Sequence, residues 1–207
     1  MVVTSSQPNV LAVTASLPAR SVRELVDYAK ANPGKLSYAS VGSGSVGHLA
    51  MALLSKQAGV RLVHVPYRGG GPAMNDAIAG HVDLLIGSTA LAIPQVQAGT
   101  IRAVVQTGKA RTPTLGTVPT VSESGFPNFE AYAWWGVFAP AGTPGEMITR
   151  FAAELAASLR EPRIATQLTE GQQVTMALAG SQELRSFLAG QMKTWGAVAR
   201  EFDIKGE

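Results

Sequence analysis

Cysteine is absent from this 207-residue sequence, and histidine occurs only three times. The absence of cysteine excludes disulfides, thiolate nucleophiles and the zinc or iron–sulfur sites that cysteine would hold. Charged residues make up 15% of the chain and aromatic residues 6%. The lysines and arginines behind the net charge of +3 are scattered, with no basic stripe between aromatics, so we expect no nucleic-acid partner.

Long apolar runs are also missing. No stretch reaches the roughly 18 residues needed to span a bilayer. The first residues, Met1–Pro8, carry neither the basic start nor the apolar centre of a signal peptide. We therefore expect either a cytosolic protein or one whose leader lies outside this chain.

What the chain has instead is a high apolar content and many glycines. Hydrophobic residues make up 46% of it, and there are 22 glycines, which is typical of a folded protein with a sizeable core. Short apolar runs alternate with amphipathic segments up to residue 106, which predicts an α/β lobe with a largely parallel sheet. The predicted strands are 9–15, 35–39, 60–66, 82–86 and 101–106, and the predicted helices are 21–32, 46–58, 72–80 and 90–98.

A connector rich in proline and glycine, residues 109–129, separates this lobe from the rest of the chain. In Thr143–Glu146 we recognise a capping box with proline at the first helical position, opening a long helix. We expect the C-terminal third to be the helix-rich outer part of a lobe whose central sheet lies elsewhere. Its other predicted elements are a strand at 133–140, a helix after residue 162, a weak strand at 173–176 and a helix at 181–201.

The most informative local pattern is a glycine- and serine-rich loop between a predicted strand and a predicted helix. Gly42, Gly44 and Gly47 spell G-x-G-x-x-G, and Ser45 is a good N-cap for the following helix. Unpaired N–H groups and the positive end of the helix dipole make such a loop a site for an anion. A second glycine-rich loop, Tyr67–Pro72, leads into the next helix with proline at its predicted first position.

Two kinds of enzyme would use residues of the first loop. A dinucleotide site needs an acidic residue about 20 positions further on to hold the ribose, and the next strand ends in Pro66–Gly69 without one. A nucleotide- or phosphate-binding enzyme remains the alternative function. A serine hydrolase would use Ser43 or Ser45 with His48, but no G-x-S-x-G motif is present.

We predict no catalytic residue, metal or cofactor. The histidines at 48, 64 and 81 are not at ligand spacing, and no H-E-x-x-H motif occurs. The acidic residues are spread over helix faces, as is normal for a solvated surface. Asp83 differs because it lies within a predicted strand, where it either bonds to neighbouring loop amides or approaches a ligand.

Five motifs follow one another along the chain: Tyr38-Ala39-Ser40-x-Gly42-x-Gly44-Ser45-x-x-His48-Leu49-Ala50, His64-Val65-Pro66-Tyr67-Arg68-Gly69-Gly70-Gly71-Pro72-Ala73, Gly80-x-Val82-Asp83, Val118-Pro119-Thr120-x-x-Glu123-x-Gly125, and Trp135-Gly136-x-x-Ala139-Pro140-x-x-Thr143-Pro144. Together they resemble the receptors of tripartite tricarboxylate transporters, the Bug-type periplasmic binding proteins. The resemblance covers essentially the whole chain from about Pro8 onward.

This resemblance implies a two-lobed periplasmic-binding-protein fold of type II. It implies a periplasmic solute-binding receptor without catalytic activity, which takes up a small organic carboxylate (a di- or tricarboxylate, an amino-dicarboxylate or an aromatic acid) and presents it to the membrane subunits of a transporter. The candidate ligand-binding residues are Ser40, Val41, Gly42, Ser43, Gly44, Ser45, His48, Tyr67, Gly69, Gly70, Asp83 and Ser88, and the resemblance makes the segment around Gly87-Ser88-Thr89 a further candidate.

Receptors of this family are usually longer, so the resemblance also implies that the first part of the usual chain is missing. We therefore expect residues 9–128 to form one complete ligand-binding α/β lobe. Residues 129–207 would supply a hinge strand and the C-terminal helices of the other, incomplete lobe. Apolar surface left by the missing segment would favour a homo-oligomer.

Overall fold

The computed structural model describes residues 2–179 and 181–205. Their backbone forms two compact units. The sheet unit consists of Pro8–Tyr132 and the residues from Ala197 onward, and the helical unit consists of Ala133–Gly196 and the residues up to Gln7. Strand β1 (Val2–Thr14) therefore contributes residues to both units.

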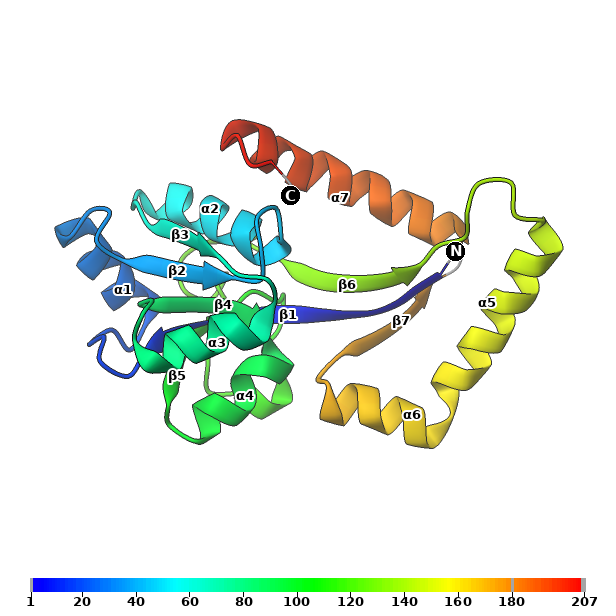
Figure 1. The fold of residues 1–207 in the computed structure, drawn as a ribbon, viewed down its shortest axis with the longest axis horizontal. Coiled ribbons are helices and arrows are strands. Elements are labelled where there is room, and N and C mark those ends of the chain that lie inside the picture. The colour runs from blue at the N-terminus through cyan, green and yellow to red at the C-terminus, as the bar shows by residue number, and fades with distance from the viewer. Residues whose placement is uncertain (1, 180, 206–207) are drawn as a thin grey trace. The chain divides into compact units, whose positions relative to one another are not determined.

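The sheet unit is built on strands in the order β3-β2-β4-β1-β5 (Figure 1). Strand β2 runs parallel to β3 and β4, whereas β1 is antiparallel to both β4 and β5. All these strands except β1 therefore share one direction, in agreement with the largely parallel sheet that the sequence predicts. The strands besides β1 are β2 (Ser37–Ser40), β3 (Val63–Pro66), β4 (Leu84–Ser88) and β5 (Ile101–Gln106).

Helices cover both faces of this sheet. Successive residues of a strand point to opposite faces, so neighbouring residues of β1 pack against different helices. Leu11 of β1 lines a small cavity together with residues of α1 and α2. Ala12 packs in a cluster with residues of α3, and Val10 packs in a cluster with residues of α4. The helices are α1 (Val22–Ala31), α2 (Val46–Ala58), α3 (Gly70–Ala79) and α4 (Thr89–Gln97), and a short 3-10 helix, η1 (Pro113–Leu115), follows β5.

The helical unit contains fewer buried residues. The first part of β1 pairs with β7 through Val3, Ser5 and Ser6, and Leu184 of α7 is fully buried. The long helix α5 has no buried residue. The elements are β6 (Tyr132–Val137), which starts at the boundary of the unit, α5 (Gly145–Arg160), α6 (Pro162–Thr166), the π-helical turn η2 (Gln167–Gly171), β7 (Thr175–Ala179) and α7 (Ser181–Glu201).

The predicted elements are present, and helix 46–58 and strand 101–106 have the predicted bounds. Strand β1 begins earlier than residue 9, because the polar residues before it pair with β7. Pro72 is the third residue of α3, since the helix already begins at Gly70. The capping box at Thr143 was wrong: its Oγ1 donates to the carbonyl of Pro140 at 2.8 Å, and α5 starts without a side-chain cap.

The compact units divide the chain differently from the predicted lobes at both ends. The residues up to Gln7 belong to the helical unit, and those from Ala197 onward belong to the sheet unit. That residues 9–128 form the ligand-binding lobe and residues 129–207 form part of a second lobe stays a prediction. Within residues 2–179 and 181–205, we find no helix with the length and apolar character of a membrane span.

Candidate ligand-binding site

The parallel strands of the sheet unit end at a common edge, which is where ligands bind in α/β proteins. Strand β2 ends at Ser40, β3 at Pro66 and β4 at Ser88, and each is followed by a helix. Strand β3, which follows β2 in sequence, lies on one side of β2 in the sheet. Strand β4, which follows β3, lies on the other side of β2. The order therefore reverses at β2, and the loop after β2 and the end of β4 flank the point of reversal.

The helices that begin at this edge share a feature that the other long helices lack. Helices α2, α3 and α4 have no acidic residue in the first turn. In contrast, α1, α5 and α7 carry Glu24, Glu146 and Glu183 there. An acidic side chain at this position offsets the positive end of the helix dipole. The positive ends of α2, α3 and α4 are thus left without an acidic side chain of their own.

Close contacts hold these helix starts together. The N–H of Tyr67, after β3, donates to the carbonyl of Ser40 at 3.0 Å. A Cβ atom added to Gly70 would lie 2.7 Å from Cδ2 of Leu91 in α4, and one added to Gly47 of α2 would lie 3.1 Å from the side chain of Ile86 in β4. Glycine at both positions therefore permits a backbone approach that a larger residue would disturb.

The loop from Ser40 to Ser45 is fixed by its own serines. The Ser40 hydroxyl, which is fully buried, donates to the carbonyl of Gly42 at 3.0 Å and accepts from its N–H at 3.3 Å. Ser45 caps α2 by accepting from the N–H of His48, and its hydroxyl donates to the same Gly42 carbonyl at 2.7 Å. Gly42 and Gly44 have φ values of 140° and 73°, which favour glycine. With the His48 N–H taken by Ser45, the N–H groups of Val46 and Gly47 at the start of α2 have no acceptor within the helix.

Two histidines and a tyrosine form an aromatic cluster beneath this loop. The rings of His48 and His64 are stacked with centroids 3.6 Å apart, and Tyr38 lies 4.9 Å from His64. His48 Nδ1 accepts the N–H of Gly44 at 3.2 Å, and His64 Nε2 lies 2.7 Å from Ser40 Oγ. Burial lowers the pKa of His48, and burial together with the neighbouring His48 lowers the pKa of His64 to about 4. Both imidazoles are therefore neutral at neutral pH.

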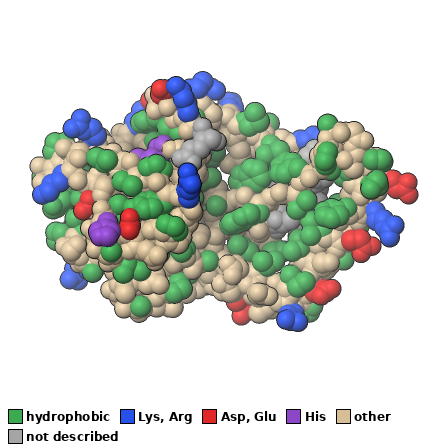
Figure 2. Space-filling view, viewed as in Figure 1, with side chains coloured by type: hydrophobic (Ala, Val, Ile, Leu, Met, Phe, Trp, Pro, Cys, Tyr) green, Lys and Arg blue, Asp and Glu red, His purple; other side chains and the backbone are tan. Residues whose placement is uncertain are grey.

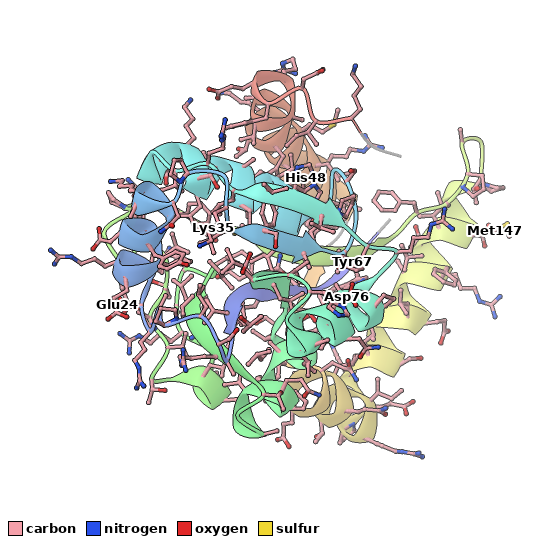
Figure 3. All side chains as sticks on the ribbon, turned by 60° about the vertical axis from the view of Figure 1, so that its left-hand side comes forward. Glu24, Lys35, His48, Tyr67, Asp76 and Met147 are labelled. Atoms are coloured by element: carbon pink, nitrogen blue, oxygen red, sulfur yellow. The ribbon has the colours of Figure 1, made fainter. Side chains whose placement is uncertain are left out.

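The second loop is held by Tyr67. Its hydroxyl donates to Asp76 of α3 at 2.7 Å, and His81 contacts the other oxygen of the same carboxylate at 3.2 Å. Desolvation and the bond to Asp76 raise the pKa of Tyr67 to about 12. In Figure 3, Tyr67 and Asp76 lie side by side near His48, whereas Lys35 and Glu24 lie toward the opposite side of the sheet unit.

The start of α4 contains a buried hydroxyl without a partner. Ser88 is the N-cap, and its side chain accepts from the N–H of Leu91 at 3.3 Å. The next residue, Thr89, is fully buried, and its Oγ1 has no hydrogen-bond partner among the described residues. A buried hydroxyl is normally paired, so such an atom is a natural contact for a ligand or an ordered water.

Asp83 lies away from this edge. Its carboxylate accepts from the N–H of Ser37 at 2.8 Å and from the hydroxyl of Ser37 at 2.9 Å, at the start of β2. Its carbonyl accepts from Thr14, the last residue of β1. Asp83 and Ser37 lie at the starts of β4 and β2, whereas the candidate site lies at the ends of these strands. We therefore remove Asp83 from the candidate site. Of the two predicted roles, bonding to neighbouring groups is the one observed.

The structure brings the other predicted residues to one edge. The side chain of Ser40 is fully buried and shapes the loop, whereas Val41 is 42% exposed. Sequence reasoning included the segment that holds Thr89 but did not include His64 in the site. His64 reaches the loop because β2 and β3 pair in parallel with Tyr38 opposite His64, a long-range contact that no local sequence signal marks. No group of three or more histidine or acidic side chains within residues 2–179 and 181–205 is suited to hold a metal ion. The candidate site comprises the predicted residues at this edge together with His64 and Thr89: Ser40, Val41, Gly42, Ser43, Gly44, Ser45, His48, His64, Tyr67, Gly69, Gly70, Ser88 and Thr89.

A fold with this sheet and this loop edge is found in solute-binding proteins of known structure. The structure of R. palustris Rpa4515 with adipate superposes with a TM-score of 0.90 at 34% identity, covering 98% of this chain and 68% of that one. MatC from Rhodopseudomonas palustris with bound malate superposes with a TM-score of 0.84 at 27% identity, covering 95% of this chain and 68% of that one.

Sequence comparison gives the same family. The protein called UPF0065 protein in tcbD-tcbE intergenic region, from Pseudomonas sp. (strain P51), is 38% identical over 207 residues, which is 99% of this chain. This chain spans 61% of the length of that relative. Residues 1–204 match the family described as tripartite tricarboxylate transporter family receptor (TctC). The chain belongs to this family, which confirms the resemblance and the α/β fold class that it implies.

Proposed function

We propose that this chain carries the carboxylate-binding surface of a periplasmic solute-binding receptor. The ligand is a small organic acid with at least one carboxylate, bound at the edge where α2, α3 and α4 begin. The receptor then presents the ligand to the membrane subunits of a tripartite tricarboxylate-type transporter. The identity of the family and the adipate and malate bound to structural relatives support this proposal.

One observation of this chain carries the proposal further than the family alone. Helices α2, α3 and α4 start at one edge without an acidic residue in the first turn, unlike α1, α5 and α7. Each favourable contact of an anion with a helix start contributes roughly 0.3–1 kcal/mol, and more when it is partly buried. Several such contacts can hold a dicarboxylate without an arginine fork.

A panel of probes tests the class of ligand. We expect malate and adipate to raise the melting temperature of the chain, since a ligand at 100 times its Kd stabilises the folded state by about 2.7 kcal/mol. Inorganic phosphate, NAD and NADP should have no effect. Stabilisation by the nucleotides without a response to the carboxylates would contradict the proposal and favour a nucleotide- or phosphate-binding enzyme.

A pair of N-cap variants tests the position of the site. Ser45 caps α2 and Ser21 caps α1 in the same way, each accepting from the N–H three residues on. Each substitution to alanine should cost about 1 kcal/mol of stability. Only Ser45→Ala should also weaken malate or adipate binding, measured by calorimetry at equal folded fraction. An equal loss of affinity in both variants would place the ligand elsewhere.

A further inference from the structure

The N–H of Gly44 is an exception among the donors near the start of α2. It lies one residue before the N-cap and donates to His48 Nδ1 at 3.2 Å, within the same turn. The N–H groups of Val46 and Gly47, at the first two positions of α2, have no acceptor within the helix. The free protein therefore covers one donor of the candidate site with an imidazole nitrogen.

A hydrogen bond from a backbone N–H defines where the proton of His48 lies. His48 Nδ1 accepts, so the proton of this neutral ring is on Nε2. Ser40 Oγ lies 3.0 Å from the carbonyl of Gly42 and 2.7 Å from His64 Nε2, and the His64 tautomer sets which of Ser40 and His64 donates. A proton added to His48 Nδ1 would point at the N–H of Gly44 and remove the acceptor from that bond.

The surroundings of His48 oppose a positive charge in the free protein. His64 of β3 is stacked on its ring at 3.6 Å, and Tyr38 of β2 lies 6.4 Å away. His48 is also in the first turn of α2, at the positive end of its dipole. Burial lowers its pKa further.

No charged side chain among the described residues compensates for this. Arg68, in the loop after β3, is exposed and makes no hydrogen bond or ion pair with His48. Glu201, from the end of α7, pairs with Lys56, which is in the last turn of α2 and so at the far end of that helix. A bound anion would therefore be the first negative charge beside the His48 ring.

We propose that His48 is a positioning residue that couples carboxylate binding to proton uptake. In the free protein its Nδ1 atom holds the Gly44 N–H. On binding, the carboxylate accepts that N–H, and Nδ1 takes one proton from solvent and donates it to the same carboxylate. The bound state then contains one anion and one imidazolium ion, so the local charge is balanced. This inference rests on the proposed function, because the anion that completes it is the ligand.

Calorimetry at two pH values tests the coupling. Malate and adipate are the probes, and the variant His48→Asn is the comparison, because asparagine keeps an acceptor near the place of Nδ1 but takes up no proton. The ratio of affinities between the two proteins cancels the protonation of the ligand itself. We expect this ratio to rise about threefold to tenfold in favour of the unchanged protein between about pH 7.5 and about pH 5.5. Binding in buffers of different ionisation enthalpy should show proton uptake only when His48 is present.

A matched control is available because the chain has only three histidines. His81 is exposed and contacts Asp76, which holds Tyr67, so the difference in pH dependence caused by His48→Asn should persist when His81→Asn is present in both proteins. Equal pH dependence of the unchanged protein and His48→Asn would overturn the inference while leaving the proposed function intact. Loss of relative affinity on acidification would also overturn it, since protonation would then open the loop. No binding of either probe at any pH would overturn the proposed function itself.

A measurement without ligand tests the same inference independently. In the free protein, the NMR signals of His48 should report the proton on Nε2 and a midpoint below the usual value for histidine. His64→Gln, which keeps a donor to Ser40 Oγ but removes the stacked ring, should move the His48 midpoint upward. A His48 ring that is already protonated at about pH 6.5 in the free protein would overturn the proposed coupling, whatever ligand the receptor takes.

Discussion

The sheet unit and the helical unit use similar apolar residues but bury them to different extents. Leu84, Leu85 and Ile86 of β4 are at most 1% exposed, whereas Met147 and Phe151 of α5 are 62% and 58% exposed. Figure 2 shows hydrophobic side chains gathered on the visible face of the part of the molecule that contains α5. A groove of about 280 Å³ in the helical unit is lined by these residues and their neighbours from the end of β6. An amphipathic pattern is therefore enough to define a helix, but not to bury it.

The largest effect that separates the units should come from removing one apolar side chain in each. Leu85→Ala should cost about 2–5 kcal/mol of unfolding free energy, because it leaves a cavity between packed layers. Met147→Ala should change stability by less than about 0.5 kcal/mol, as is usual for an exposed side chain. Urea denaturation of both variants at low protein concentration measures the difference.

The sequence also predicts a homo-oligomer. Self-association through α5 would bury Met147 and so reduce the difference between the effects of Leu85→Ala and Met147→Ala on stability. If the apolar face of α5 forms contacts between copies, Met147→Ala should become costly as protein concentration rises. Phe151→Glu should then shift the sedimentation coefficient toward that of a monomer. A concentration-independent monomer in both the unchanged chain and the variant would contradict the predicted homo-oligomer.

A second comparison uses two glycines in the left-handed region, one from each unit. Gly42 has a φ of 140° and Gly142 a φ of 86°, so alanine is strained at both. Each substitution should cost about 1 kcal/mol of stability. Only Gly42→Ala should lower malate or adipate affinity, by about tenfold or more, because it changes the loop that holds the anion. Isothermal titration calorimetry that found equal losses would contradict the placement of the site.

The smallest expected effect on stability comes from replacing a threonine near the start of a helix in each unit, Thr89 of α4 and Thr149 of α5. Thr89 Oγ1 has no partner among the described residues, whereas Thr149 Oγ1 of α5 donates to the carbonyl of Gly145 at 2.9 Å. Thr89→Val should raise the unfolding free energy of the free protein by about 0.5–1 kcal/mol, because it removes an unpaired buried hydroxyl. It should also reduce the thermal shift that malate or adipate produces.

Thr149→Val serves as the control, since this threonine is exposed on α5 and lies outside the candidate site. It should leave the ligand-induced shift unchanged and alter stability only slightly. Destabilisation by Thr89→Val, measured by urea denaturation without ligand, would mean that the hydroxyl has a water partner and is structural.

The sequence predicts features that depend on neighbouring residues and fails for those that depend on long-range pairing. Periodicity and capping residues are local signals, so helix 46–58 and its Ser45 cap follow directly from the residues. The glycine-rich loops also predict an anion site, and the structure places both loops at one edge of the sheet. Long-range pairings have no such signal: the stacking of His64 on His48 depends on β2 and β3 lying in register, and the bond of Asp83 to Ser37 depends on the pairing of β2 with β4.

Strand β1 has a consequence for the order in which the protein folds. It pairs with β4, β5, β6 and β7, so the partners of its residues lie as far along the chain as Ala179. By contrast, β2, α2 and β3 follow one another within residues 37–66 and form a unit of short sequence separation. Contacts of large sequence separation slow folding, because the entropy of loop closure must be overcome before they form. The parallel strands should therefore assemble early, with β1 inserted between β4 and β5 only after residue 106 is in place. The folding rate of the sheet unit should thus depend most on the pairings of β1 with β4 and β5.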